Sequence, residues 1–98
     1  MKKEELIKVV ETQLRVTFKQ MCHSRKGRTI MARRILVVLL NEENYSDEYI
    51  AKVLVKSELT ISLDLQHADE KLQHDKQFKR FYLSCIAKIT EKEDNNDL

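Results

Sequence analysis

The chain has 98 residues and a formal net charge of only +2, which fits one domain of modest size. It contains no proline and a single glycine, Gly27, and this disfavours sheets and barrels, whose turns need such residues. No apolar run approaches the roughly 18 residues of a membrane-spanning helix, and the first residues lack the apolar stretch of a signal peptide. We therefore expect an all-helical cytoplasmic protein with no membrane contact.

Apolar residues recur at the spacing of a helix turn in five segments, which predicts a compact all-α domain of five helices over residues 1–90. The expected helices span about 3–20, 29–42, 46–54, 57–74 and 75–90. The second is nearly all apolar after Arg34, so it should form the centre of the core. The residues expected to be buried are Ile35, Val38, Leu39, Ile61, Leu65, Phe78 and Ile86.

Besides a loop at residues 41–45 and a tight connection at 55–57, two segments are expected to lie outside the helices. Residues 22–27 form a polar break that holds the only glycine and should separate the first two helices. Residues 91–98 are acidic and rich in asparagine, and we expect a disordered tail there. Ser46 and Ser57 precede the third and fourth helices and are good N-cap candidates.

Basic residues are concentrated in the first half of the chain. Between Thr12 and Asn41 there are seven Lys or Arg residues and no acid. Five gather at the first loop and the start of the second helix: Arg25, Lys26, Arg28, Arg33 and Arg34. A helix N-terminus adds free N–H groups and a positive dipole end. This distribution predicts binding to a polyanion through the release of counterions, whereas the alternative is an ordinary solvated face.

Residues 50–62 follow the pattern of a helix-turn-helix. Ala51 would allow close approach of two helices, Leu54 would anchor the first, and Ser57 would cap the second. That second helix is normally the one laid in the major groove of DNA. Lys56, Ser57 and Thr60, at its start, are therefore further candidates for DNA contact.

The chain also resembles the C-terminal DNA-binding domain of the bacterial replication initiator DnaA. Residues 24–26 (SRK) and 32–40 (ARRILVVLL) are similar to the arginine loop and the following helix of that domain. Residues 44–46 (NYS) with Ile50 resemble its Asn-Leu-Ser…Ile-Gly segment, and residues 75–80 (DKQFKR) resemble its closing Asp-Lys-Glu-Phe-Arg-Arg. The similarity spans about residues 7–89 and implies a Trp repressor-like helix-turn-helix.

The resemblance implies roles for individual residues. The loop arginine that matches Arg25 enters the minor groove, and the helix arginine that matches Arg33 lies at the phosphate backbone. The family's base-reading signature, Gly-Gly-Arg-Asp-His-Thr-Thr-Val, is degenerate here, and only Thr60 remains of its reading residues. The expected function is therefore DNA binding that is mainly electrostatic and weakly sequence-specific.

An alternative function is a protein-interaction or dimerisation module that kept the fold and lost base reading. Leu59 and Leu63 are one turn apart and lie off the core stripe, so they are the candidate contact with a partner or a second copy.

Nothing in the sequence indicates catalysis. The three histidines lack metal-ligand spacing, and there is no glycine-rich phosphate loop. We expect no enzyme activity, no cofactor, no metal and no small-molecule substrate, and we expect Cys22 and Cys85 to be unpaired.

Overall fold

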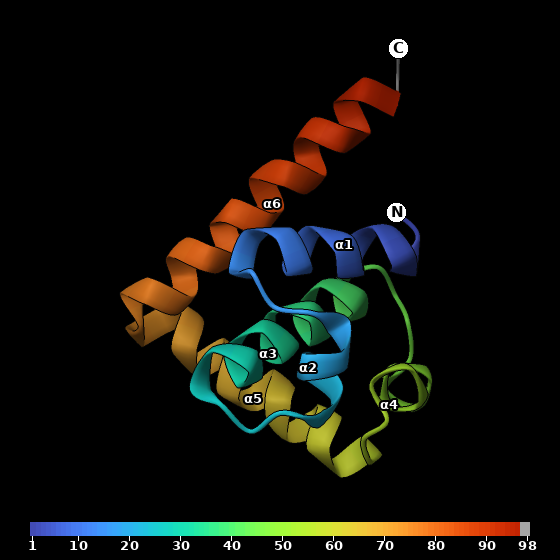
Figure 1. Cartoon of the computed structure of the whole chain (residues 1–98), viewed down its shortest axis with the longest axis vertical. Coiled ribbons are helices and arrows are strands. Elements are labelled where there is room, and N and C mark those ends of the chain that lie inside the picture. Colours follow the sequence, from blue (N-terminus) through green and yellow to red (C-terminus); the bar gives the residue numbers. More distant parts are fainter. Residues whose placement is uncertain (97–98) are drawn as a thin grey trace.

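A computed structural model describes residues 1–96, which contain six α-helices and no strand (Figure 1). The helices are α1 (Lys3–Leu14), α2 (Phe18–His23), α3 (Gly27–Glu42), α4 (Asp47–Leu54), α5 (Glu58–His74) and α6 (Lys76–Asn96). The all-helical class is confirmed. The predicted number of five helices is wrong, because the first predicted helix is two.

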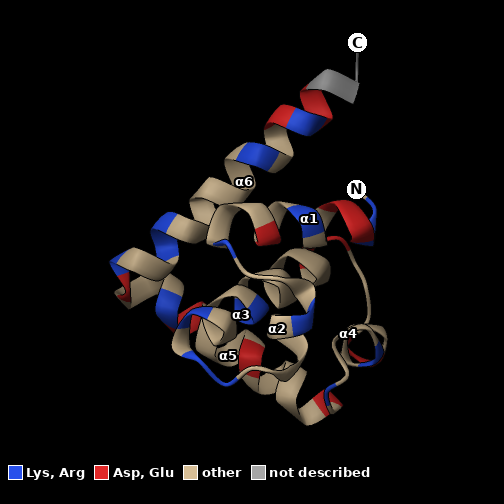
Figure 2. Ribbon diagram, viewed as in Figure 1, with Lys and Arg blue, Asp and Glu red and all other residues tan. Residues whose placement is uncertain are grey.

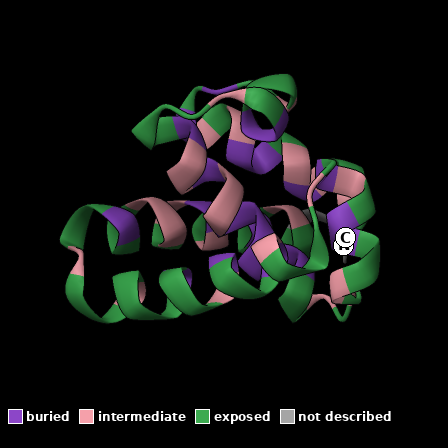
Figure 3. Ribbon diagram, turned by 90° about the horizontal axis from the view of Figure 1, so that it is seen from below, coloured by how far each residue is buried: buried purple, intermediate pink, exposed green. Residues whose placement is uncertain are grey.

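The central helix is α3, and α1, α2, α4 and α5 all pack against it. Its apolar run from Ile35 to Leu40 is buried throughout, as the sequence predicted. Figure 1 shows α6 passing beside α1 and extending beyond the other helices at its C-terminal end. Buried residues gather where the helices face one another, and the outward faces are exposed (Figure 3). Of the residues predicted to be buried, only Leu65 and Ile86 are partly exposed.

The break between α1 and α2 corrects the predicted helix at 3–20. Helix α1 ends because Arg15 adopts the left-handed conformation, with φ 57°. Thr17 then begins α2 with a capping box, in which its hydroxyl accepts from the Gln20 amide at 3.1 Å and the Gln20 side chain accepts from the Thr17 amide at 2.9 Å. The Glu11 carboxylate accepts from the Phe18 amide at 2.8 Å. These bonds satisfy N–H groups that a continuous helix would have paired internally.

Two further boundaries differ from expectation. The polar break is shorter than residues 22–27, because α2 continues to His23 and Gly27 is already the first residue of α3. Residues 91–96 continue α6 where a disordered tail was expected, and residues 97–98 lie outside the described part of the chain. No glycine or proline interrupts this end of α6, and Lys88 lies 3.5 Å from Glu91 one turn on.

Helices α4 and α5 are joined by only three residues, Val55–Ser57. The hydroxyls of Ser46 and Ser57 cap the two helices, as predicted, by accepting from the Tyr49 and Thr60 amides at 3.1 Å each. Val55 turns the chain in the left-handed conformation, with φ 56° and ψ 50°. In Figure 1, α4 is seen end-on while α5 runs across the view. The short turn therefore sets the two helices steeply across one another.

Candidate nucleic-acid interface

The loop between α2 and α3 presents two free cations. Arg25 and Lys26 are exposed, and neither has an ion-pair partner among the described residues. The Ser24 hydroxyl accepts from the Lys26 amide at 3.2 Å and shapes the loop. Figure 2 shows this basic loop leading into the start of α3.

The first turn of α3 is open to a ligand. The first amides of any helix have no intrahelical partner, and here no N-cap side chain accepts a hydrogen bond from them. Gly27 adds no bulk there, because a Cβ built at this position would meet nothing within 4 Å. Exposed cations beside an uncapped helix of 16 residues form an arrangement suited to a phosphate.

Arg28 is held in place by the protein rather than left free. Its Nε donates to the Leu14 carbonyl at 2.8 Å, and its guanidinium lies 5.5 Å from the centre of the Phe81 ring. This geometry joins the end of α1, the start of α3 and the second turn of α6. Arg28 is still exposed. Its Nε–H positions the side chain, and its remaining N–H groups are available to a phosphate.

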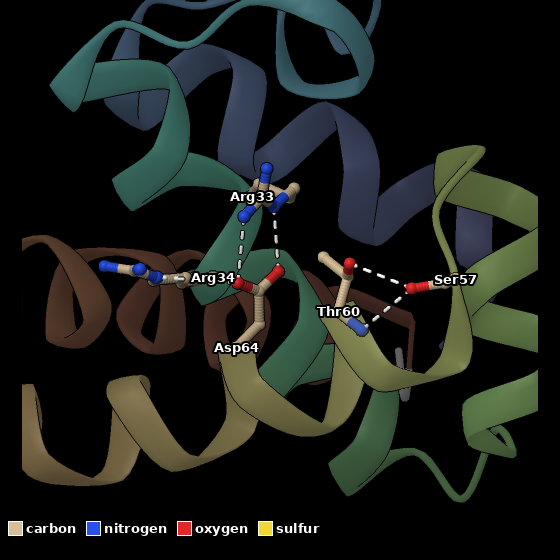
Figure 4. Close-up of polar contacts among 5 residues, drawn as sticks. All are labelled: Arg33, Arg34, Ser57, Thr60 and Asp64. Carbon is tan, nitrogen blue, oxygen red and sulfur yellow. Dashed lines mark hydrogen bonds and ion pairs between the residues drawn. The ribbon is translucent and has the colours of Figure 1, made fainter.

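Arg33 is engaged inside the fold, contrary to the phosphate contact predicted for it, and Arg34 lies beside the same partner. Arg33 donates to both carboxylate oxygens of Asp64, from Nε at 2.8 Å and from Nη2 at 2.9 Å (Figure 4). Arg34 Nε lies 3.5 Å from the same carboxylate. The side chains of Asp64 and Arg33 are only 3% and 13% exposed. This buried ion pair joins α3 to α5 and engages Arg33, whereas Arg34 Nε has no hydrogen-bond partner among the described residues and the Arg34 side chain is 24% exposed.

The start of α5 uses its polar groups for capping. Besides accepting from the Thr60 amide, the Ser57 hydroxyl lies 3.0 Å from the Thr60 hydroxyl (Figure 4). Thr60 and Lys56 are both half-buried, and the Lys56 amide donates to the Ala51 carbonyl at 2.9 Å. Of the three DNA contacts predicted here, only the Lys56 ammonium is uncommitted. The hydroxyls of Ser57 and Thr60 take part in the hydrogen bonds that cap α5.

The outward face of α5 is apolar. Leu59 and Leu63 are 69% and 43% exposed, so the sequence placed both correctly on the surface. Val55, in the preceding turn, is 66% exposed and was missed. A β-branched residue in the left-handed region is a genuine conformational outlier. The sequence signal is the absence of glycine from a three-residue turn between two helices.

The remaining reactive groups do not assemble into a site. Among residues 1–96, no group of three or more His, Cys, Asp or Glu residues is placed to hold a metal. Cys22 and Cys85 are buried and unpaired, and burial raises the pKa of the Cys85 thiol to about 12. Burial and a hydrogen bond to Glu42 also raise the pKa of Tyr82. No described helix is both long and apolar enough to span a membrane.

Comparison with protein-family models, with curated proteins and with solved structures finds no match to this chain.

Proposed function

We propose that this chain binds double-stranded DNA, mainly through phosphate contacts, as a helix-turn-helix protein that resembles the DnaA C-terminal domain. The observation that carries the proposal is the exposure of Arg25 and Lys26 beside the uncapped start of α3. Phosphate contacts of this kind supply affinity and position a protein on a duplex, but they carry no sequence information. The α4–turn–α5 geometry supports the resemblance.

Weak sequence preference follows from the chemistry of α5. The side chains at its outward start are Glu58, Leu59 and Leu63, all exposed. Base reading in the major groove needs donors and acceptors such as Arg, Asn or Gln, and here the Ser57 and Thr60 hydroxyls are used in the cap. We therefore expect less than about a hundredfold preference between any two duplexes, which corresponds to less than about 2.7 kcal/mol.

The test is fluorescence anisotropy with a labelled duplex over a series of salt concentrations. If about four phosphates are neutralised, log K should fall against log salt with a slope of roughly −3.6. The double variant Arg25→Ala/Lys26→Ala should flatten that slope to roughly −1.8. The matched control is Lys8→Ala/Lys92→Ala, which removes the same charge from a separate place where α1 meets α6. Equal slopes in the two double variants would refute the proposal.

A second candidate function is a protein-interaction module, and a specific observation favours it. Val55, Leu59 and Leu63 form an exposed apolar surface on the turn and α5, which we call the α5 apolar surface. A conformationally costly and exposed valine is unfavourable in a free monomer. Sedimentation velocity from low to high micromolar concentration tests self-association through this surface. A concentration-dependent dimer that Leu63→Glu abolishes would establish this function, and a monomer throughout would exclude a homodimer.

A further inference from the structure

A second acid-free stretch lies in α6. From Lys76 to Thr90 the sequence contains no Asp or Glu, and it carries four cations. These are Lys76, Lys79, Arg80 and Lys88. The stretch is as one-sided in charge as the region between Thr12 and Asn41, although it is far from that region in the sequence.

The fold brings the two acid-free stretches together. Arg28 at the start of α3 lies over the Phe81 ring, and Gln77 and Phe81 line a surface hollow with Gly27 and Arg28. One turn further along α6, the Ser84 hydroxyl donates to the Gln13 side chain of α1. The flank of α6 that begins at Gln77 therefore adjoins the open end of α3.

Two of the α6 cations lie beside that flank. Arg80 is three residues after Gln77 and four before Ser84, so it lies next to both on the helix surface, and Lys76 is one turn before Arg80. Both side chains are exposed and neither has an ion-pair partner among the described residues. The nearby Asp75 does not cancel them, because its carboxylate accepts from the Phe78 amide at 3.0 Å and lies 3.6 Å from Lys71. Figure 2 shows basic segments of the loop and of the first half of α6 on the same side of the molecule.

We infer that the DNA duplex lies across the start of α3 and the first turns of α6, with Arg25, Lys26, Lys76 and Arg80 as its phosphate ligands. This inference rests on the proposed DNA binding and adds the direction in which the duplex crosses the protein. The duplex follows the cations, so it does not run along α5, whose outward face offers leucines and an acid. The α5 apolar surface then stays uncovered when DNA is bound.

The experiment compares double variants of the full chain on one labelled random-sequence duplex. Four phosphate contacts predict that the affinity of the unaltered chain falls about 150-fold between 50 and 200 mM salt. Lys76→Ala/Arg80→Ala should reduce that fall to about 12-fold. Lys52→Ala/Lys56→Ala, on α4 and its turn, tests the alternative position of the duplex along α4 and α5. The matched control is Lys8→Ala/Lys92→Ala, where α1 meets α6, and it should keep the full dependence of about 150-fold. Lys76→Gln/Arg80→Gln repeats the test if the alanine variant loses helical circular dichroism.

The outcomes separate the two proposals. If Lys52→Ala/Lys56→Ala flattens the salt dependence and Lys76→Ala/Arg80→Ala does not, the duplex lies along α4 and α5 and the inference is overturned, while DNA binding stands. Flattening by both variants also overturns it, because the duplex then touches both faces. No salt-dependent binding by the unaltered chain would remove the proposed function itself. As an independent check, Leu63→Glu should leave the affinity unchanged, whereas an added acid in a groove-bound helix would weaken it severalfold.

Discussion

Replacing Asp64 by alanine should destabilise the fold more than any other change of a charged residue to alanine. The substitution leaves Arg33, whose side chain is 13% exposed, without its bidentate partner, and it also deprives Arg34 of its nearest carboxylate. Breaking a buried ion pair by removing one partner costs about 3–5 kcal/mol. Domains of this size have only about 5–15 kcal/mol in total. The melting temperature should fall by about 12–40 °C, since each kcal/mol is worth about 4–8 °C here.

The assay is thermal and urea denaturation followed by circular dichroism at 222 nm. Asp69→Ala is the matched control, because Asp69 is an exposed acid on the same helix, and its loss should cost less than about 0.5 kcal/mol. The double variant Arg33→Met/Asp64→Leu should recover most of the lost stability, since apolar residues can replace a buried pair. If Asp64→Ala costs no more than Asp69→Ala, the pair does not hold α5 on α3.

Three further predictions concern the turn, the cap and the buried thiol. Val55→Gly should raise the free energy of unfolding by about 0.5–1 kcal/mol in urea denaturation. The reason is that the strain of a left-handed valine, about 1–2 kcal/mol, is larger than the free-energy cost of the extra entropy that glycine gives the unfolded chain. A lower free energy of unfolding would show that Val55 is not strained. Ser57→Ala should lower the free energy of unfolding by about 1 kcal/mol, because the first turn of α5 loses its cap, and an unchanged urea midpoint would argue against that cap. The folded pKa of Cys85 is raised from 9.0 to about 12, so its stabilising contribution is present below pH 9 and is lost as the pH rises toward 12. The urea midpoint should therefore fall over that pH range, and it should fall less in the Cys85→Ala variant. Both chains are compared in a Tyr82→Phe background, because the pKa of Tyr82 is also raised. An identical fall with and without Cys85 would exclude the thiol as the cause.

Local sequence signals predict most of the helices. The boundary between α1 and α2 was not predicted, although the sequence contains a signal for it. Apolar spacing continues from Leu14 to Phe18 across the end of α1, which favoured a single helix. The competing signal is Thr17 followed three residues later by Gln20, the pattern of a capping box. The structure shows that the cap decides the boundary. Side-chain hydrogen bonds at a helix start can outweigh the continuity of an apolar stripe.

The role of Arg33 could not be read from its own neighbourhood, because its partner lies 31 residues away. The signal was on the other helix. Asp64 lies on the same stripe of α5 as Ile61 and Ala68, both of which are fully buried, and an acid on a buried stripe requires a partner. A count of the charges near Arg33 in the sequence treats it as a free cation. The core-facing position of Asp64 instead indicates that this acid needs a cationic partner, which in the structure is Arg33 of α3.

The consumption of Arg33 also explains why the two candidate surfaces are separate. An arginine held by Asp64 cannot place a phosphate next to α5. The cations that we propose as phosphate ligands instead flank the open end of α3 and the first turns of α6. The first turns of α5 itself carry no cation, and its outward face presents Leu59 and Leu63 instead. Asp64 and Leu63 are adjacent in the sequence and lie on different sides of the same turn of α5. Asp64 points inward to Arg33, and Leu63 points outward to solvent. A protein partner on α5 and a duplex across α3 and α6 could then be bound together without competing for any side chain.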